Sequence, residues 1–77
     1  MELNVIYNEE CLQGLKKLPE KCVDMCITSP PYYNLRDYKA NRQIGIEKSV
    51  DLFVNNLCDI FEEIKRVLKD EGVCWVN

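Results

Sequence analysis

The stretch Val-Asp-Met-Cys-Ile-Thr-Ser-Pro-Pro-Tyr, residues 23–32, decides how this chain folds. Its first six residues form a short and largely apolar run without helical periodicity, which is typical of a buried strand. Ser29, Pro30 and Pro31 follow at once, and the prolines have a fixed φ and no backbone N–H. We therefore predict a strand over residues 23–28 that leads directly into a rigid turn.

On the amino side of this strand, the sequence predicts another strand and a helix. Residues 3–7 (Leu-Asn-Val-Ile-Tyr) are rich in β-branched and aromatic side chains and show no helical period, so we expect a first strand there. Asn8 is a good N-cap residue, and a helix over about residues 9–18 is expected to follow and to end at Pro19. The apolar positions that recur at helical spacing are Cys11, Leu12, Leu15 and Leu18.

On the carboxyl side, residues 29–46 show no sustained period and are predicted to form a long loop, a feature that is usually functional in a compact domain. Ser49 is placed as an N-cap, and a broad apolar stripe at helical spacing continues from it to Leu68. Glu62 and Arg66 are spaced as an i,i+4 ion pair on this helix. Gly72 is expected to end the region after the helix, and residues 73–76 (Val-Cys-Trp-Val) are predicted to form a third buried strand with Trp75 in the core.

The predicted order of strand, helix, strand, long loop, long helix and strand indicates an α/β fold with three predominantly parallel strands and two helices. In open sheets of this kind, ligands bind beyond the carboxyl ends of the strands. The long loop begins at that end of the second strand, so position and composition favour the same functional site.

Length and composition exclude several classes of protein. With 77 residues the chain holds a single small domain, and no apolar run approaches the roughly 20 residues that cross a bilayer. A net charge of −3 excludes a protein that binds nucleic acid through an overall positive charge, so any contact with DNA must be made by local cationic residues. The amino terminus is not a signal peptide and the cysteine count of five is odd, which favours a reducing cytoplasm.

The cysteines are interpreted as small hydrophobic residues. Cys22 and Cys26 are the closest pair and do not form a CxxC motif, and the chain has no histidine, so we expect no metal site. Cys26 and Cys74 fall inside predicted strands and are expected to be buried. A zinc-stabilised interaction domain is retained as the third of three alternatives.

The Ser29-Pro30-Pro31-Tyr32 segment is the motif that carries chemistry. The prolines present carbonyl oxygens without competing N–H donors, Ser29 adds a side-chain oxygen, and Tyr32 adds a flat ring that can stack on a heterocycle. Such a pocket suits an aromatic amine, whose delocalised lone pair must be drawn back to the nitrogen before it can attack a methyl group. Hydrogen bonds from the amine to Ser29 and to the Pro30 carbonyl would do this.

The run from Asp24 to Tyr32, with Leu-Arg-Asp-Tyr at residues 35–38, closely resembles the N-terminal part of site-specific, amino-group DNA methyltransferases. The resemblance implies part of a Rossmann-like fold, S-adenosylmethionine as the methyl donor, DNA as the substrate, and a role in DNA methylation and restriction-modification. It also implies that Ser29, Pro30, Pro31 and Tyr32 are catalytic and that the target base is flipped out of the duplex. The serine form of the motif favours cytosine N4, with adenine N6 as the alternative.

Further residues are candidates through the same resemblance. Glu10 stands where the family often has an aspartate near the adenosine end of the cofactor, although a carboxylate there can equally serve the dipole of the helix. Arg36, Lys39 and Arg42 are candidates for contacts to DNA phosphates or to the orphan partner base, with solvated loop charges as the alternative.

The family's Gly-rich cofactor loop and target-recognition region are not found in residues 1–77, whose three glycines are not clustered. We therefore expect an N-terminal portion of a methyltransferase domain, inactive alone and completed by the C-terminal portion or by a complementing chain. In that case strands from the missing portion would lie between the first and second strands. The competing interpretation is a self-sufficient small α/β module that binds a partner without catalysis.

Overall fold

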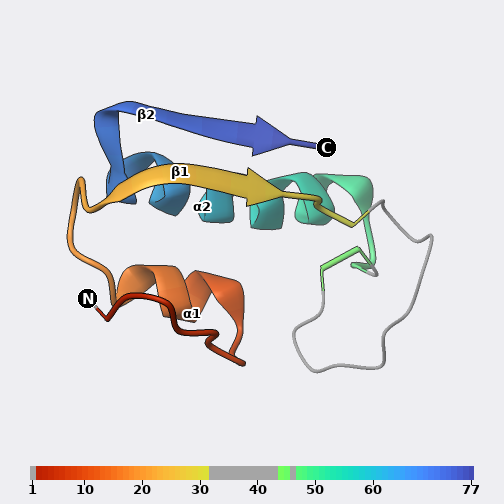
Figure 1. Cartoon of the computed structure of the whole chain (residues 1–77). Helices are drawn as coiled ribbons and strands as arrows, with labels where there is room; N and C mark the ends of the chain where they lie inside the picture. Colours follow the sequence, from red (N-terminus) through yellow and green to blue (C-terminus); the bar gives the residue numbers. More distant parts are fainter. Residues whose placement is uncertain (1, 32–43, 46) are drawn as a thin grey trace.

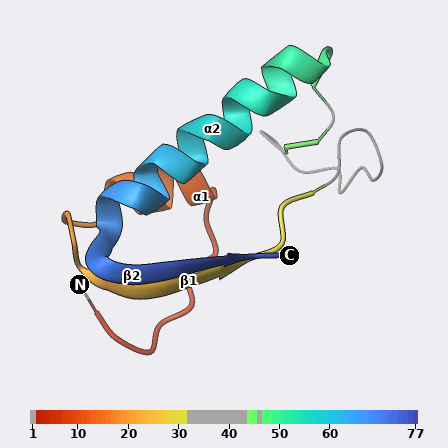
Figure 2. The same ribbon diagram turned by 90° about the horizontal axis from the view of Figure 1, so that it is seen from above.

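The computed structural model of the chain describes residues 2–31, 44–45 and 47–77. These residues form helix α1 (Cys11–Lys16), strand β1 (Val23–Thr28), helix α2 (Val50–Val67) and strand β2 (Leu68–Val76), in that order. The two strands lie side by side, α2 runs along one face of the sheet, and α1 packs against α2 (Figure 1 and Figure 2). The predicted small α/β arrangement with two helices is confirmed.

The two strands pair in parallel, as predicted. Cys26, Ile27 and Thr28 of β1 stand opposite Cys74, Trp75 and Val76 of β2. The ladder runs one step further, because the N–H of Asn77 donates to the carbonyl oxygen of Thr28 at 3.0 Å. Hydrogen bonding in the sheet therefore reaches the residue directly before Ser29.

Strand β2 carries an irregularity near its start. Val23 stands opposite Leu68, but Met25 stands opposite Val73, so the chain between them is longer in β2 than in β1. Gly72 lies in this bulge: a Cβ atom there would come within 3.0 Å of the Lys69 carbonyl oxygen and 3.1 Å of the Asp24 carbonyl oxygen. The expectation that Gly72 ends a region between helix and strand is wrong, because β2 begins directly after α2 and Gly72 allows a close approach of backbones inside the strand.

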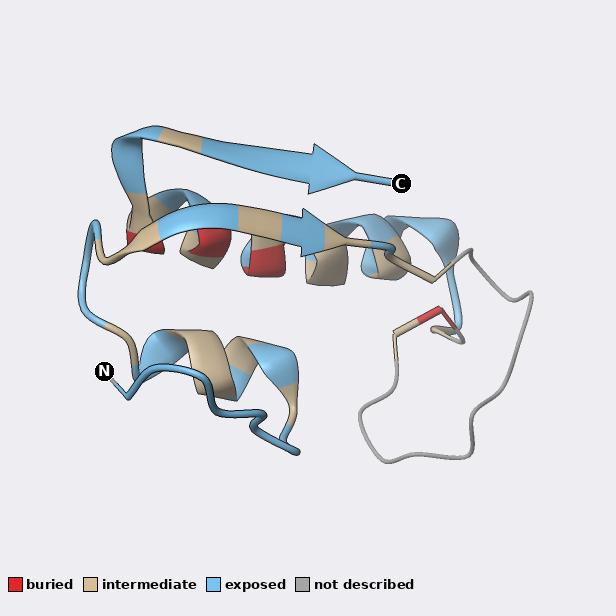
Figure 3. Cartoon of the chain, viewed as in Figure 1, coloured by how far each residue is buried: buried red, intermediate tan, exposed pale blue. Residues whose placement is uncertain are grey.

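Helix α2 agrees closely with the sequence. The Ser49 hydroxyl oxygen accepts the N–H of Leu52 at 3.2 Å, which confirms Ser49 as the N-cap. The buried apolar side chains of the described chain are Ile60, Ile64 and Val67, which share one face of this helix (Figure 3). This small set of side chains is the core over which the sheet and α1 meet.

The amino end of the chain differs from the prediction. No strand forms at residues 3–7 in the described chain, where Leu3 and Ile6 are 75% and 97% exposed. Two physical reasons apply: Asn4 has a φ of 60°, which interrupts an extended backbone, and β1 and β2 pair only with each other. The sequence-based count of three strands is therefore corrected to two.

Helix α1 is shorter than predicted and begins later. Its N-cap is Glu10 and not Asn8, since the Glu10 carboxylate accepts the N–H groups of Leu12 and Gln13 at 3.2 and 2.9 Å. A carboxylate at this position also interacts favourably with the helix dipole.

The carboxyl end of α1 is held by a side chain of α2. Nη2 of Arg66 donates to the carbonyl oxygens of Leu15 and Leu18, at 3.0 and 2.9 Å, and Nε donates to Glu63 at 3.1 Å. The predicted ion pair of Arg66 with Glu62 is wrong: the partner lies at i−3, which leaves the guanidinium pointing toward α1. The Leu15 carbonyl also accepts the N–H of Leu18 at 3.0 Å, so Arg66 adds a charged donor to the last turn of α1 and ties that turn to α2.

Two core predictions fail in the strands. Trp75 is 63% exposed and Cys74 is also exposed, while Cys26 is only half-buried. Only one face of the sheet is covered by a helix, so Trp75 on the other face meets solvent (Figure 2). Cys74 lies on the side of α2 and lines a cavity between α2 and β2, so the helix covers that side only in part. The apolar residues of β1 and β2 are typical of strands that are buried on both faces of a sheet. In the described residues, a helix lies on one face only.

We expect Gly72→Ala to lower the free energy of unfolding by about 1–3 kcal/mol, because the new methyl group would press on two backbone oxygens that cannot turn away. The matched control is Gly14→Ala in α1, where the methyl group would meet only the end of the flexible Glu9 side chain. That change is expected to be neutral or to stabilise by up to about 1 kcal/mol, since glycine weakens a helix interior. Urea unfolding followed by circular dichroism measures both, and equal effects would contradict the role assigned to Gly72.

We expect Arg66→Lys to destabilise the chain by about 1–3 kcal/mol, because an ammonium group cannot hold both carbonyls and Glu63 at once. The reverse exchange at the neighbouring exposed position, Lys65→Arg, serves as the control and should change stability by less than about 0.5 kcal/mol. Hydrogen exchange of the α1 amides is the more specific measurement. If these amides exchange as slowly in Arg66→Lys as in the unaltered chain, the Arg66 guanidinium does not hold the end of α1 in place.

Candidate active site

The motif that the sequence predicts to be catalytic begins where β1 ends. The Thr28 carbonyl is fixed by the sheet, and the next residues, Ser29, Pro30 and Pro31, leave the sheet at its carboxyl edge. Ser29 is exposed, and the two prolines are half-buried. The Ser29 hydroxyl and the two proline carbonyls thus follow directly after the last hydrogen-bonded residue of the strand, Thr28.

Both helices begin on the same side of the molecule as the carboxyl ends of the strands. Each runs antiparallel to the strands, so the amino ends of α1 and α2 lie on the side toward which the arrowhead of β1 points (Figure 1). Helix amino ends carry partial positive charge and free N–H groups. The amino ends of both helices thus lie on the same side of the molecule as the acceptor oxygens after β1, although α2 diverges from the sheet toward its amino end (Figure 2). Side chains of Glu10 and Ser49 already accept N–H groups at these helix ends.

Glu10 stands at one of these helix ends. Both of its carboxylate oxygens accept backbone N–H groups of α1, at 3.2 and 2.9 Å. Each oxygen has a second lone pair, so the capping interaction leaves acceptor capacity toward the edge. The local role of Glu10 is to start α1, and a contact to a cofactor remains a proposal.

A second carboxylate, Glu47, joins the segment before α2 to the helix. Its Oε1 accepts the N–H of Gly45 at 2.7 Å, and its Oε2 accepts the side-chain amide of Asn56 at 2.8 Å. Burial acts to raise the pKa of the Glu47 carboxyl, but hydrogen bonds from Asn56 and from backbone N–H groups outweigh it and lower the pKa. The carboxylate is thus held in its charged form. The hydrogen bonds from Gly45 and Asn56 to Glu47 weaken only as the pH falls through that lowered pKa.

The sequence analysis did not predict the hydrogen bonds of Glu47 with Gly45 and Asn56, nor those of Arg66 with the end of α1. Gly45 is buried and has a φ of 111°, a backbone conformation that glycine adopts without strain. The only signal in the sequence was the glycine itself, two residues before an acidic side chain. The partner in α2 could not be found from local spacing, because Asn56 lies nine residues away from Glu47.

Four of the predicted site residues lie outside the described residues. These are the aromatic member of the motif and the three cations of the long loop, namely Tyr32, Arg36, Lys39 and Arg42. Ser29, Pro30, Pro31 and Glu10 are described: the first three follow β1, and Glu10 caps the amino end of α1.

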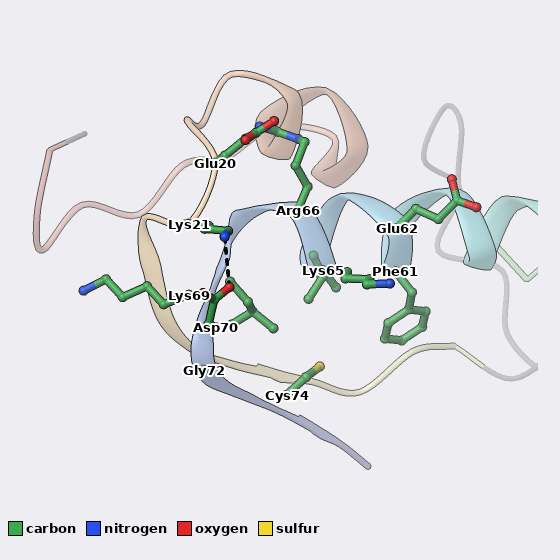
Figure 4. Close-up of a pocket in the computed structure, with 12 residues that line it drawn as sticks. Glu20, Lys21, Phe61, Glu62, Lys65, Arg66, Lys69, Asp70, Gly72 and Cys74 are labelled. Carbon is green, nitrogen blue, oxygen red and sulfur yellow. Dashed lines mark ion pairs between the residues drawn. The ribbon is translucent and has the colours of Figure 1, made fainter.

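A cavity of about 640 Å³ lies elsewhere, between α2 and β2 (Figure 4). Its apolar floor includes Phe61, Leu68 and Cys74, and its rim carries charges of both signs, including the ion pair of Lys21 with Asp70 at 3.0 Å. This cavity does not include the Ser29 segment. It opens beside the outer edge of β2, where the sheet has no further strand among the described residues.

The described residues hold no group of three or more His, Cys, Asp or Glu side chains arranged for a metal ion. Cys26 and Cys74 are neighbours across the sheet, and none of the five cysteines forms a disulfide. Burial raises the pKa of the Cys26 thiol, and Cys74 raises it further, so this thiol stays protonated at neutral pH. Within the part of the chain that the structure describes, no helix is long and apolar enough to span a bilayer.

The chain is similar to several DNA methyltransferases. It is 47% identical to the type II methyltransferase M.Cfr9I of Citrobacter freundii over 79 residues, which cover all of this chain and 26% of that protein. It is 42% identical to M.XycI of Xanthomonas campestris pv. cyanopsidis, over 96% of this chain and 25% of that protein. It is 31% identical to the DNA adenine methyltransferase YhdJ of Escherichia coli, over 97% of this chain and 24% of that protein.

The chain thus spans about a quarter of the length of these relatives. No solved structure matches it. The DNA methylase family of N6 and N4 methyltransferases matches residues 23–77, from the first residue of β1 through α2 and β2. Since that match covers well over half of the sequence and includes the Ser29-Pro30-Pro31 segment at the end of β1, the chain belongs to the N6/N4 DNA methylase family.

Proposed function

We propose that residues 1–77 are the portion of a site-specific DNA methyltransferase that carries the catalytic motif, and that the complete enzyme methylates cytosine N4. The observation that supports this most strongly is the place of Ser29-Pro30-Pro31, directly after a hydrogen-bonded strand and at the carboxyl edge of the parallel sheet. In parallel α/β sheets this edge is where ligands bind.

The chemistry follows from the oxygens of the motif. The hydroxyl oxygen of Ser29 and the carbonyl oxygen of Pro30 accept the two hydrogens of the exocyclic amine, which favours a pyramidal nitrogen with a localised lone pair. S-adenosylmethionine supplies the electrophilic methyl group when it is bound. The surplus proton of the methylated nitrogen leaves along the hydrogen bond to Ser29, which is exposed and therefore in contact with water.

The base must leave the duplex to reach this position, and extrusion costs a few kcal/mol of stacking and pairing. Stacking on the Tyr32 ring offsets part of that cost. Arg36, Lys39 and Arg42 are the cations that would contact DNA phosphates or the orphan base. Local cations are needed because the chain as a whole has a net charge of −3.

The chain alone fits the methyl donor only in part. Gly14 lies in α1, Gly45 before α2 and Gly72 in the bulge of β2, so the glycines do not form one loop against which a cofactor could be held. Glu10 is the one described candidate for a cofactor contact. We therefore assign the remaining cofactor contacts to the portion of the enzyme outside these residues.

Adenine N6 is the alternative target. The Escherichia coli relative is a DNA adenine methyltransferase, whereas the names of the two type II relatives specify no base. The serine in Ser29-Pro30-Pro31 supports cytosine N4. A non-catalytic binding module is less well supported, because a self-sufficient domain would not leave one face of its sheet without cover.

The catalytic role is tested in a chimaera in which residues 1–77 replace the aligned quarter of the Citrobacter freundii enzyme. We expect Ser29→Ala to slow methyl transfer by at least about 100-fold, because a preorganised acceptor of the amine is lost. The control is Ser49→Ala, the same change at the N-cap of α2, which should cost about 1 kcal/mol of stability without a comparable loss of rate. Retained activity in folded Ser29→Ala would remove the proposed mechanism, and mass spectrometry of the modified nucleosides distinguishes N4-methylcytosine from N6-methyladenine.

The division of the cofactor site is tested with the 77-residue chain by itself. We expect isothermal titration calorimetry to detect no binding of S-adenosylmethionine at micromolar concentrations, because the chain lacks a clustered-glycine loop. The chimaera described above is the positive control. Micromolar binding by the isolated chain would contradict the assignment of the cofactor contacts to the missing portion.

A further inference from the structure

Two cysteines stand side by side in the sheet. Cys26 of β1 is paired in register with Cys74 of β2, and side chains paired in this way point to the same face of a parallel sheet. That face is the one toward α2, because Cys74 lines the cavity between α2 and β2 together with Phe61 (Figure 4). The two thiols are close enough to form a hydrogen bond with each other. Local cysteine spacing could not reveal this pair, because only strand pairing brings the two residues together.

The thiol pair is accessible from one side. Cys74 is exposed and Cys26 is half-buried, and the cavity beside Cys74 has a volume of about 640 Å³. Phe61, Ile64 and Leu68 contribute apolar surface to this cavity. An ion can therefore reach the two sulfur atoms through the cavity, where the apolar neighbours limit the access of water to the bound ion.

A disulfide is not the product that this geometry favours. Neighbouring strands are about 4.7–4.9 Å apart, whereas the Cβ atoms of a disulfide are separated by about 3.5–4.5 Å. An S–S bond would therefore have to draw the two strands together or twist the sheet locally. A bridging metal ion needs more room, because two metal–sulfur bonds of about 2.3 Å in a line span about 4.6 Å. The strand spacing thus fits two sulfur atoms that share an ion better than two that are bonded directly.

The donor set selects the kind of ion. Among the described residues, no group of three or more His, Cys, Asp or Glu side chains is arranged to hold a metal, so the pair offers two sulfur ligands. Structural zinc takes four ligands, and calcium and magnesium take oxygen ligands. Two soft thiolates instead suit copper(I), a d10 ion that accepts linear coordination by two ligands.

We propose that Cys26 and Cys74 form a binding site for a thiophilic, two-coordinate ion of the copper(I) class, which bridges β1 and β2 beneath α2. On binding, each thiol releases its proton to solvent and two copper–sulfur bonds form. The oxidation state of the copper does not change, and the bound centre carries one negative charge. The site is independent of the proposed function, because it uses neither the motif after β1 nor the methyl donor.

The test is an anaerobic titration of the 77-residue chain with copper(I) in competition with a chromophoric copper(I) chelator. We expect a single ion per chain, with sulfur-to-copper charge-transfer absorption in the ultraviolet. Cys26→Ser and Cys74→Ser should each weaken binding at least about 10-fold, because one thiol cannot supply linear coordination. The matched controls are Cys11→Ser and Cys58→Ser, which remove exposed thiols of α1 and α2 and should leave the affinity within about 3-fold.

The double variant Cys26→Ser/Cys74→Ser distinguishes one shared site from two independent thiols. It should bind copper(I) no more weakly than either single variant, because each single change already removes the site. Circular dichroism checks that every variant keeps its helices. Equal weakening by Cys58→Ser, or full affinity in either Cys26→Ser or Cys74→Ser, would overturn the proposal.

Two measurements on the unaltered chain need no substitution. Copper X-ray absorption should detect two sulfur ligands and no others, so a third ligand, or a nitrogen or oxygen ligand, would contradict the site. Native mass spectrometry should find the ion on a monomer. A copper-dependent dimer would also overturn the proposal, because the ion would then join thiols of two chains.

Discussion

The last turn of α2 is the point from which the rest of the fold is arranged. The carbonyl oxygens at the end of a helix have no partners within it. Here the N–H groups of Lys21 and Cys22 donate to the carbonyls of Arg66 and Val67, at 3.0 and 2.8 Å, while the Arg66 side chain holds two carbonyls at the end of α1. One turn of helix thus fixes the entry to β1 and the carboxyl end of α1, and it continues directly into β2.

This constraint explains the position of the candidate active site. Because β1 enters beside the end of α2 and β2 leaves from it, both strands start at the same level and must run in the same direction. Their carboxyl ends then meet at the opposite side of the molecule, where α1 and α2 begin (Figure 1). Ser29-Pro30-Pro31 follows Thr28, whose carbonyl is hydrogen-bonded to Asn77 at that edge. The hydrogen bonds at the end of α2, far from the motif, therefore determine where the motif lies.

The same arrangement leaves the fold incomplete. Only Ile60, Ile64 and Val67 are buried hydrophobic residues among those described, whereas the strands carry the apolar residues of a sheet covered on both faces. The chain spans about a quarter of the length of the relatives it matches. The exposed Trp75 and the unpaired segment at residues 3–7 are consistent with this, because both have strand-like sequences that require neighbours from elsewhere.

The sequence by itself determined the elements whose signals are local. Strand β1, the N-cap at Ser49, the long helix and the parallel order follow from apolar periodicity, capping chemistry and the connection rules, and the Ser29-Pro30-Pro31 motif identifies the family. Only the tertiary structure decided that Arg66 turns to α1 and not to Glu62, that Glu47 holds Asn56, and that Gly72 lies in a bulge. Only the tertiary structure also decided that residues 3–7 are unpaired and that Trp75 is exposed. Strand pairing and burial depend on neighbours that are distant in sequence, whereas apolar periodicity shows only which residues are suited to be buried.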